Sequence, residues 1–320
     1  MTVLKVALTA VLIYFLYHQI DRHWLQIRDH PWQINWLLLG AALAVGLVAL
    51  AVIASNWQVL IRAFGHRIPL LRVCRIFYLA DMGRYVPGKI WALLGFVYLA
   101  RKEGVAPEQA TASFVLSQML LIPASFLVAA IAIQVDSRIL VDQVALLGRY
   151  SAWTFMALML ATMVIVIVWP GRVLSVVNFL LHKLNREVIT FRLDKRVALQ
   201  VFLRYLLGWF VYGAGFWLFI GSVTPYSSLG LIAAAGVFAA AYQIGYLSLF
   251  APGGFGPREL VMGFMLTPFL GPLAPAVAIL ARLWVIAVEV CAALIALAIG
   301  GKPALPGSKD SGAGKSKDEV

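Results

Sequence analysis

Two short runs rich in proline, glycine and charge interrupt long apolar stretches of the sequence. The first reads Asp-Met-Gly-Arg-Tyr-Val-Pro-Gly-Lys over residues 81–89, and the second reads Ala-Pro-Gly-Gly-Phe-Gly-Pro-Arg-Glu over residues 251–259. Proline lacks a backbone N–H and disfavours helix in the residue before it, and glycine adds backbone freedom. Each run is therefore predicted to break a helix.

A helix that begins just after such a break directs unpaired backbone N–H groups and the positive end of its dipole toward the break. Lys89 and Arg258 lie at these two helix starts, and Arg84 adds a second cation to the first run. The backbone at Gly253 and Gly254 could form a concave nest that holds an anion. These five residues are the candidate anion site, and a phosphodiester group is the ligand that their chemistry would suit.

A structural role for the same cations is the alternative. Their long side chains could extend to an aqueous interface, or they could pair with Asp81 and Glu259 and hold the broken segments shut. Two more ionisable residues, Arg282 and Glu289, lie seven positions apart in the last apolar segment, on nearly the same face of a helix. Ionisable groups inside a membrane span are costly and are candidates for function.

Glu289 is placed about 22 Å from the start of its segment at a rise of 1.5 Å per residue, somewhat past the middle of a membrane. Three roles stay open for it. It could couple transport to protons, bind a basic headgroup, or act as a counter-ion to Arg84 or Arg258. Asp81, Glu259 and Arg282 belong to the same set of coupling or counter-ion candidates.

The elements that position these residues are predicted to be membrane helices. Of the 320 residues, 62% are apolar and 12% are charged, and the mean hydropathy is +0.89. Soluble domains are roughly half apolar and a quarter charged, so the chain belongs to the membrane class. A helix needs about 20 mostly apolar residues to span the hydrocarbon core. Six segments are predicted to do so: 6–20, 36–54, 110–135, 150–169, 197–223 and 274–299.

The two broken stretches, 76–100 and 229–270, do not fit as simple spans. The halves that follow each break, 90–100 and 260–270, hold about 11 residues each and are too short to cross. Broken backbone at membrane depth is tolerated only where protein or a water-filled cavity surrounds it. Both stretches are therefore predicted to be re-entrant hairpins. An eight-span arrangement is the alternative, because 229–250 is long enough to cross.

The order of elements repeats: two spans, a broken hairpin and a third span. Three crossings per repeat place the second repeat upside down relative to the first, which is the inverted-repeat plan of many transporters. The chain is thus predicted to be all-α, with one transmembrane domain over 1–300 and pseudo-repeats over about 1–135 and 150–300. The remaining segment, 301–320, is rich in glycine, serine, lysine and aspartate and is predicted to be a disordered tail.

The distribution of lysine and arginine predicts the orientation, because short cytoplasmic loops are enriched in both. Loops 21–35 and 136–149 balance basic against acidic residues, whereas 62–75 holds four arginines and no acid, and 170–196 is strongly basic. The pattern alternates as six spans with both termini in the cytoplasm of a bacterial cell require. The net charge of +12 then faces anionic lipid headgroups, and no nucleic-acid partner is expected.

The two breaks resemble a known family. The run 83–89, the Arg-Lys-Glu-Gly-Val sequence at 101–105 and the run 252–259 are similar to the flippase-like transmembrane region of lysylphosphatidylglycerol synthase and its stand-alone relatives. The resemblance extends over roughly residues 1–300. It implies a role in moving glycolipids, polyprenyl-linked lipids or hopanoids in the membrane. No soluble synthase domain is expected among these 320 residues, and Pro257 stands where the family usually has a small aliphatic residue.

An enzymatic function finds little support in the sequence. It contains no catalytic Ser-His-Asp set, nucleotide-binding loop, or Cys and His spacing typical of a metal site, and the two cysteines lie far apart. No metal or other cofactor is expected. A lipid translocase is the favoured function, and membrane lipids are the expected partners. The alternatives are a partner subunit of a separately encoded lipid-modifying enzyme and an intramembrane transferase acting on a lipid carrier; a homo-oligomer is also open.

Overall fold

The computed structural model describes residues 24–85, 90–139, 194–224, 227–248 and 251–299, together with isolated positions at 17, 21, 153, 154, 157, 160, 161 and 164. Throughout this part of the chain the regular structure is helical, with no strand, which confirms the predicted all-α class. Apart from those isolated positions, the predicted spans 6–20 and 150–169 lie outside the described residues, as do residues 86–89 and the tail 301–320. The number of spans therefore stays a prediction.

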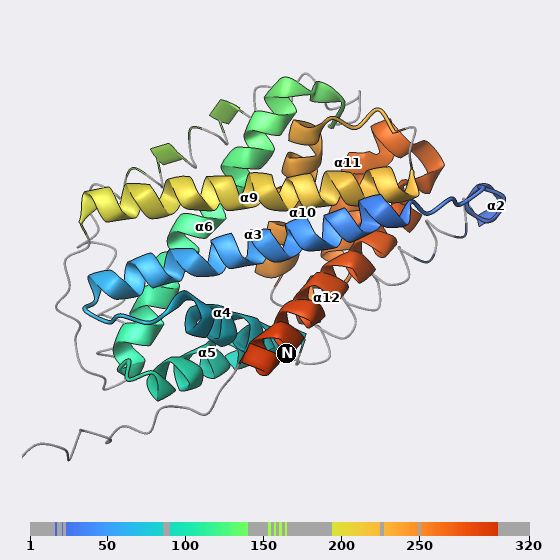
Figure 1. Cartoon of the computed structure of the whole chain (residues 1–320). Coiled ribbons are helices and arrows are strands. Elements are labelled where there is room, and N and C mark those ends of the chain that lie inside the picture. Colours follow the sequence, from blue (N-terminus) through green and yellow to red (C-terminus); the bar gives the residue numbers. More distant parts are fainter. Residues whose placement is uncertain are drawn as a thin grey trace, which may run out of the picture.

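Within the described residues, four helical stretches are long and apolar enough to cross a membrane (Figure 1). They contain α3 (Trp36–Ala63), α6 (Pro107–Val135), α9 (Lys195–Val223) and α12 (Ala274–Ile299), the last of which follows α11 without a long interruption. Each corresponds to a predicted span. Helix α3 continues nine residues beyond the predicted limit, and polar residues near its end are buried; Gln58 donates to the carbonyl of Ile68, in the segment before α4, at 2.8 Å.

The two broken stretches form helical hairpins. The first contains α4 (Leu70–Asp81), the 3₁₀ turn η1 (Met82–Tyr85) and α5 (Ile90–Lys102). The second contains α10 (Leu231–Leu247), η3 (Pro252–Gly254) and α11 (Pro257–Leu270). In each hairpin the two helices pack against each other. Their lengths of 12, 13, 17 and 14 residues are all below the about 20 that a span needs.

Two boundaries differ from the prediction. Helix α4 begins at Leu70, directly after Pro69, so Arg72 and Arg75 lie on a helix and not in a loop. Helix α11 begins at Pro257, because proline is well suited to the first position of a helix, where its missing N–H would have no partner. Arg258 therefore occupies the first helical turn. The short elements α2 (Trp24–Arg28), η2 (Ser137–Ile139) and η4 (Gly271–Leu273) complete the described structure.

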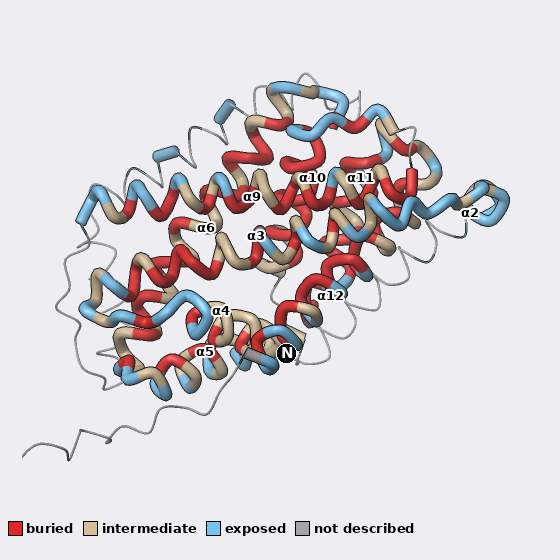
Figure 2. Tube along the Cα trace, viewed as in Figure 1, coloured by how far each residue is buried: buried red, intermediate tan, exposed pale blue. Residues whose placement is uncertain are grey.

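Helices α3 and α9 pack side by side and run antiparallel. The backbone N–H of Asn35, before α3, donates to the carbonyl of Ser222 near the end of α9 at 2.9 Å, and Arg204 donates to Ser55 at 2.6 Å. Small residues allow this close approach, since a Cβ added at Gly215 would lie 3.3 Å from the carbonyl oxygen of Ala42. Buried residues line the facing sides of these helices in Figure 2.

The helix contacts repeat with a two-fold pattern. If α3 is exchanged with α9, α4 with α10, α5 with α11 and α6 with α12, every packed pair among these eight described helices becomes another packed pair. For example, α10 packs on α6, and α4 packs on α12. Because α3 and α9 are antiparallel, the rotation axis that relates the two sets runs across the helices.

Candidate functional site

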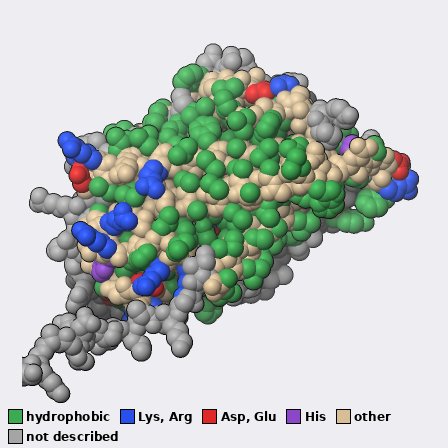
Figure 3. All heavy atoms as spheres, viewed as in Figure 1, with side chains coloured by type: hydrophobic (Ala, Val, Ile, Leu, Met, Phe, Trp, Pro, Cys, Tyr) green, Lys and Arg blue, Asp and Glu red, His purple; other side chains and the backbone are tan. Residues whose placement is uncertain are grey.

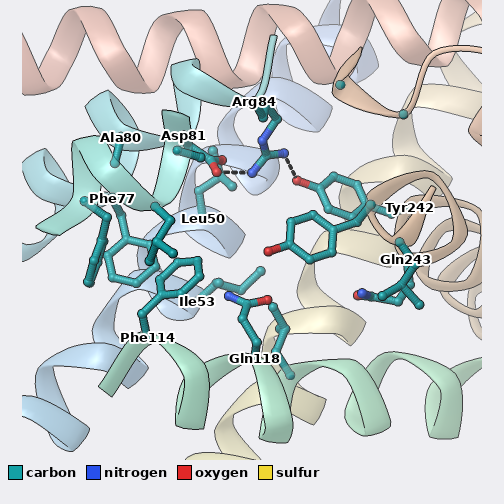
Figure 4. A pocket seen from close by; sticks show the side chains of 18 of the residues that line it. Leu50, Ile53, Phe77, Ala80, Asp81, Arg84, Phe114, Gln118, Tyr242 and Gln243 are labelled. Atoms are coloured by element: carbon teal, nitrogen blue, oxygen red, sulfur yellow. Dashed lines mark hydrogen bonds and ion pairs between the residues drawn. The ribbon is translucent and has the colours of Figure 1, made fainter. Parts of the chain in front are cut away.

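The two breaks meet at the centre of the molecule. The turns η1 and η3 contact each other, and a cavity of about 330 Å³ lies beside them, enclosed by both hairpins and by α3, α6 and α9 (Figure 4). Most of its lining is apolar or aromatic and includes Phe77, Phe96 and Phe114. The polar lining includes Asp81, Arg84, Gln118, Tyr242, Gln243 and Arg258. A cavity with one charged region and an otherwise apolar wall suits an amphipathic ligand.

Arg84 is the centre of an ion-pair cluster. Its guanidinium pairs with Asp81 one helical turn earlier and donates to the hydroxyl of Tyr242 on α10. It also donates to Glu289 on α12, with 3.0 Å between Nη1 and Oε1. The cluster thus joins the first break to both α10 and α12.

Glu289 is a counter-ion to Arg84, which is one of the roles left open by the sequence. Its side chain is only 2% exposed. Besides Arg84 it accepts hydrogen bonds from the hydroxyls of Tyr85 at 2.5 Å and Tyr242 at 3.4 Å. Three donors from the two hairpins therefore converge on one carboxylate, and the first break is bonded to α12 through it.

Arg258 differs from Arg84 because no carboxylate neutralises it at close range. It is 3% exposed, and among the described residues it forms no ion pair within 4.0 Å. Its guanidinium carbon lies 4.0 Å from the centroid of the Tyr242 ring, a cation–π contact. Its Nε is buried with no hydrogen-bond partner in the described structure. A buried cation in this state can be neutralised by a bound anion.

Glu259 is not the partner of Arg258, which corrects the structural alternative considered for that pair. One oxygen of Glu259 accepts the backbone N–H of Gly256 at 2.7 Å and caps the start of α11. The other oxygen faces Arg282, with 3.6 Å between Oε1 and Nη1. The reason is geometric: adjacent residues on a helix point in directions about 100° apart, so the Glu259 side chain turns back to the cap.

Gly253 and Gly254 line the cavity and have left-handed backbone angles, with φ of 57° and 74°. A Cβ at Gly253 would lie 2.9 Å from Nη2 of Arg282, and one at Gly254 would lie 2.7 Å from the carbonyl carbon of Gly245. Glycine is therefore required at both positions. The N–H of Gly254 already donates to Ala251 at 3.0 Å, so the proposed anion nest would have to use other donors.

The structure brings eight of the nine predicted site residues to one region; Lys89 lies outside the described residues. The sequence interpretation did not include Tyr85, Tyr242, Gln118 and Gln243. The last two carry buried polar atoms, Gln118 Oε1 and Gln243 Nε2, without a hydrogen-bond partner among the described residues. Polar side chains within otherwise apolar helices could have identified them. No group of three or more potential metal ligands occurs in the described part of the chain.

Comparison with known proteins agrees with the resemblance seen in the breaks. The profile of the family described as Lysylphosphatidylglycerol synthase TM region matches residues 2–300. The chain belongs to this family. The match includes both broken hairpins and α12, and it indicates a lipid-related function in a membrane. No curated protein matches the chain.

Proposed function

We propose that this protein is a lipid translocase that moves an anionic phospholipid, or a polyprenyl- or sugar-linked lipid, across the bacterial inner membrane. The observation that carries the proposal is Arg258, a buried arginine without a close counter-ion, at the charged region of an apolar cavity between two broken hairpins. A lipid phosphate would neutralise this charge, and Gln118 and Gln243 would bond to the polar groups attached to it.

The arrangement of the helices supports movement as well as binding. Each hairpin helix is too short to span, so the breaks are expected to lie at membrane depth as re-entrant hairpins. The contacts within one set of helices repeat those within the other set, and the axis that relates the two sets runs across the helices. This arrangement agrees with an inverted repeat. In such a design the two sets exchange conformations, and a site at their junction opens first to one side and then to the other.

The charge distribution supports an orientation with both termini in the cytoplasm. Lys and Arg gather at the end of the molecule where α3 ends and α9 begins (Figure 3). Charges at the other end are balanced in the described residues by the pairs Arg28 with Asp29 and Arg138 with Asp136. The basic end is then cytoplasmic.

We predict that a single cysteine introduced at position 180 of a cysteine-free variant reacts with a membrane-impermeant thiol reagent only after the cells are opened. A cysteine at position 143 should react in intact cells, and it serves as the positive control. Reaction of position 180 in intact cells would contradict both the orientation and the inverted repeat.

The proposal includes no chemical step, and purified protein in liposomes tests it. We predict that the protein moves a fluorescent anionic phospholipid between leaflets, measured by the fraction that an impermeant quencher reaches over time. Formation of a modified lipid would instead support an intramembrane transferase. Inactivity that is relieved only by a co-purifying protein would support a subunit of a lipid-modifying enzyme.

A further inference from the structure

The charges around the cavity are unevenly paired. Three arginines and three carboxylates gather there among the described residues, so the set is neutral as a whole. Arg282 and Glu259 face each other one to one. Asp81 and Glu289, in contrast, share the single cation Arg84. This group of three has a net charge of −1, and it is balanced through Tyr242 by the +1 of Arg258.

An anion bound to Arg258 would remove that balance. The neighbouring group of Asp81, Arg84 and Glu289 would then be left with one surplus negative charge in a region of low dielectric constant. Two carboxylates that share one cation relieve such a surplus most readily by taking up a proton. Arginine remains protonated under all relevant conditions, so only the carboxylates can adjust.

We propose that binding of a lipid phosphate at Arg258 is coupled to uptake of one proton, which Asp81 and Glu289 share. The inference rests on the proposed function, because it requires the anion site. It makes the lipid and one proton travel together, so that a proton gradient could drive the movement. Among the described residues, the ionisable groups near this carboxylate pair are Arg84 and Tyr85 on η1, Tyr212 on α9, Tyr242 and Tyr246 on α10, Arg258 on α11 and Arg282 on α12.

The experiment is calorimetric titration of the purified protein in an uncharged detergent with a short-chain phosphatidylglycerol. Its phosphodiester does not titrate from about pH 5 to about pH 9, so any proton taken up belongs to the protein. Titration in buffers of different ionisation enthalpy gives the number of protons bound per lipid. We expect the number of protons taken up per lipid to reach a maximum close to one. The affinity for the lipid should fall by up to about tenfold for each pH unit of increase through that range.

Variants identify the groups that take up the proton. In Glu289→Gln only Asp81 remains beside Arg84, so lipid should still bind while proton uptake falls close to zero. In Asp81→Asn only Glu289 remains beside Arg84, so lipid should again bind with proton uptake close to zero. The control is Asp136→Asn, which removes a carboxylate paired one to one with Arg138 outside the cavity and should keep the uptake of the wild type.

Each outcome separates the two proposals. Lipid binding that releases or takes up no protons at any pH rejects the coupling and leaves the anion site intact. Proton uptake that persists unchanged in both the Glu289→Gln and Asp81→Asn variants rejects the assignment of the proton to Asp81 and Glu289. Absence of lipid binding by the wild type rejects the anion site and the coupling together.

Discussion

Replacing Arg258 with alanine is expected to reduce lipid movement in liposomes at least about tenfold while the protein still folds. A charge-assisted hydrogen bond to a phosphate contributes about 1.5–3 kcal/mol, which corresponds to about tenfold or more in binding. When Arg258 is removed, the nearby carboxylates keep their nearest cations, because Glu259 faces Arg282 and Asp81 contacts Arg84. Stability should therefore fall by less than the about 3–5 kcal/mol that breaking a buried ion pair costs.

Two further variants make this prediction specific. Arg258→Lys should recover only part of the movement, because a point charge replaces a planar fork that bonds two phosphate oxygens at once. Arg204→Ala removes another arginine of a membrane helix, one that bonds Ser55 outside the cavity, and should move lipid at the wild-type rate. Normal movement by a stable Arg258→Ala protein would show that the cation has no role in binding.

Replacing Glu289 with alanine is expected to lower the free energy of unfolding by about 3–5 kcal/mol, the cost of removing one partner of a buried ion pair. The carboxylate accepts bonds from Arg84, Tyr85 and Tyr242, so its loss removes an acceptor from one buried and two partly buried donors. The measurement is thermal or denaturant unfolding in detergent. Glu289→Gln should cost less, because the amide oxygen still accepts from the two tyrosines.

A matched control separates burial from ion pairing. Glu103 faces Arg72 with 3.0 Å between the charged atoms, the same separation as between Glu289 and Arg84, but the pair lies at the surface. Glu103→Ala should therefore change stability by about 1 kcal/mol or less. Equal effects of the two alanine substitutions would contradict the structural role assigned to Glu289.

Much of the helical framework could be predicted from composition and spacing alone. Runs of about 20 apolar residues located α3, α6, α9 and α12, and the proline and glycine pairs located both breaks. These signals are local, because a helix in a membrane must satisfy its own backbone hydrogen bonds. The early start of α4 at Leu70 was missed because its first turns are amphipathic and carry Arg72 and Arg75.

The pairing of charges could not be predicted, because it depends on which helix faces meet. Sequence proximity suggested that Arg258 and Glu259 pair, whereas the second partner of Glu259 is Arg282 from a different helix. The sequence likewise offered Glu289 two possible cations, and packing of α12 beside η1 selects Arg84. Tyr242 on α10 contacts both Arg84 and Arg258, and no spacing rule encodes this meeting of three separate elements.

Whether the cavity holds an anionic headgroup against Arg258 is measured most directly by native mass spectrometry of the protein released from mild detergent. Wild type and Arg204→Ala should each retain one phosphate-bearing lipid per chain, identified by its mass and fragments, and Arg258→Ala should lose it. Retention of the same lipid in the same amount by a folded Arg258→Ala protein, or retention by the wild type of uncharged or zwitterionic lipid alone, would contradict the headgroup site.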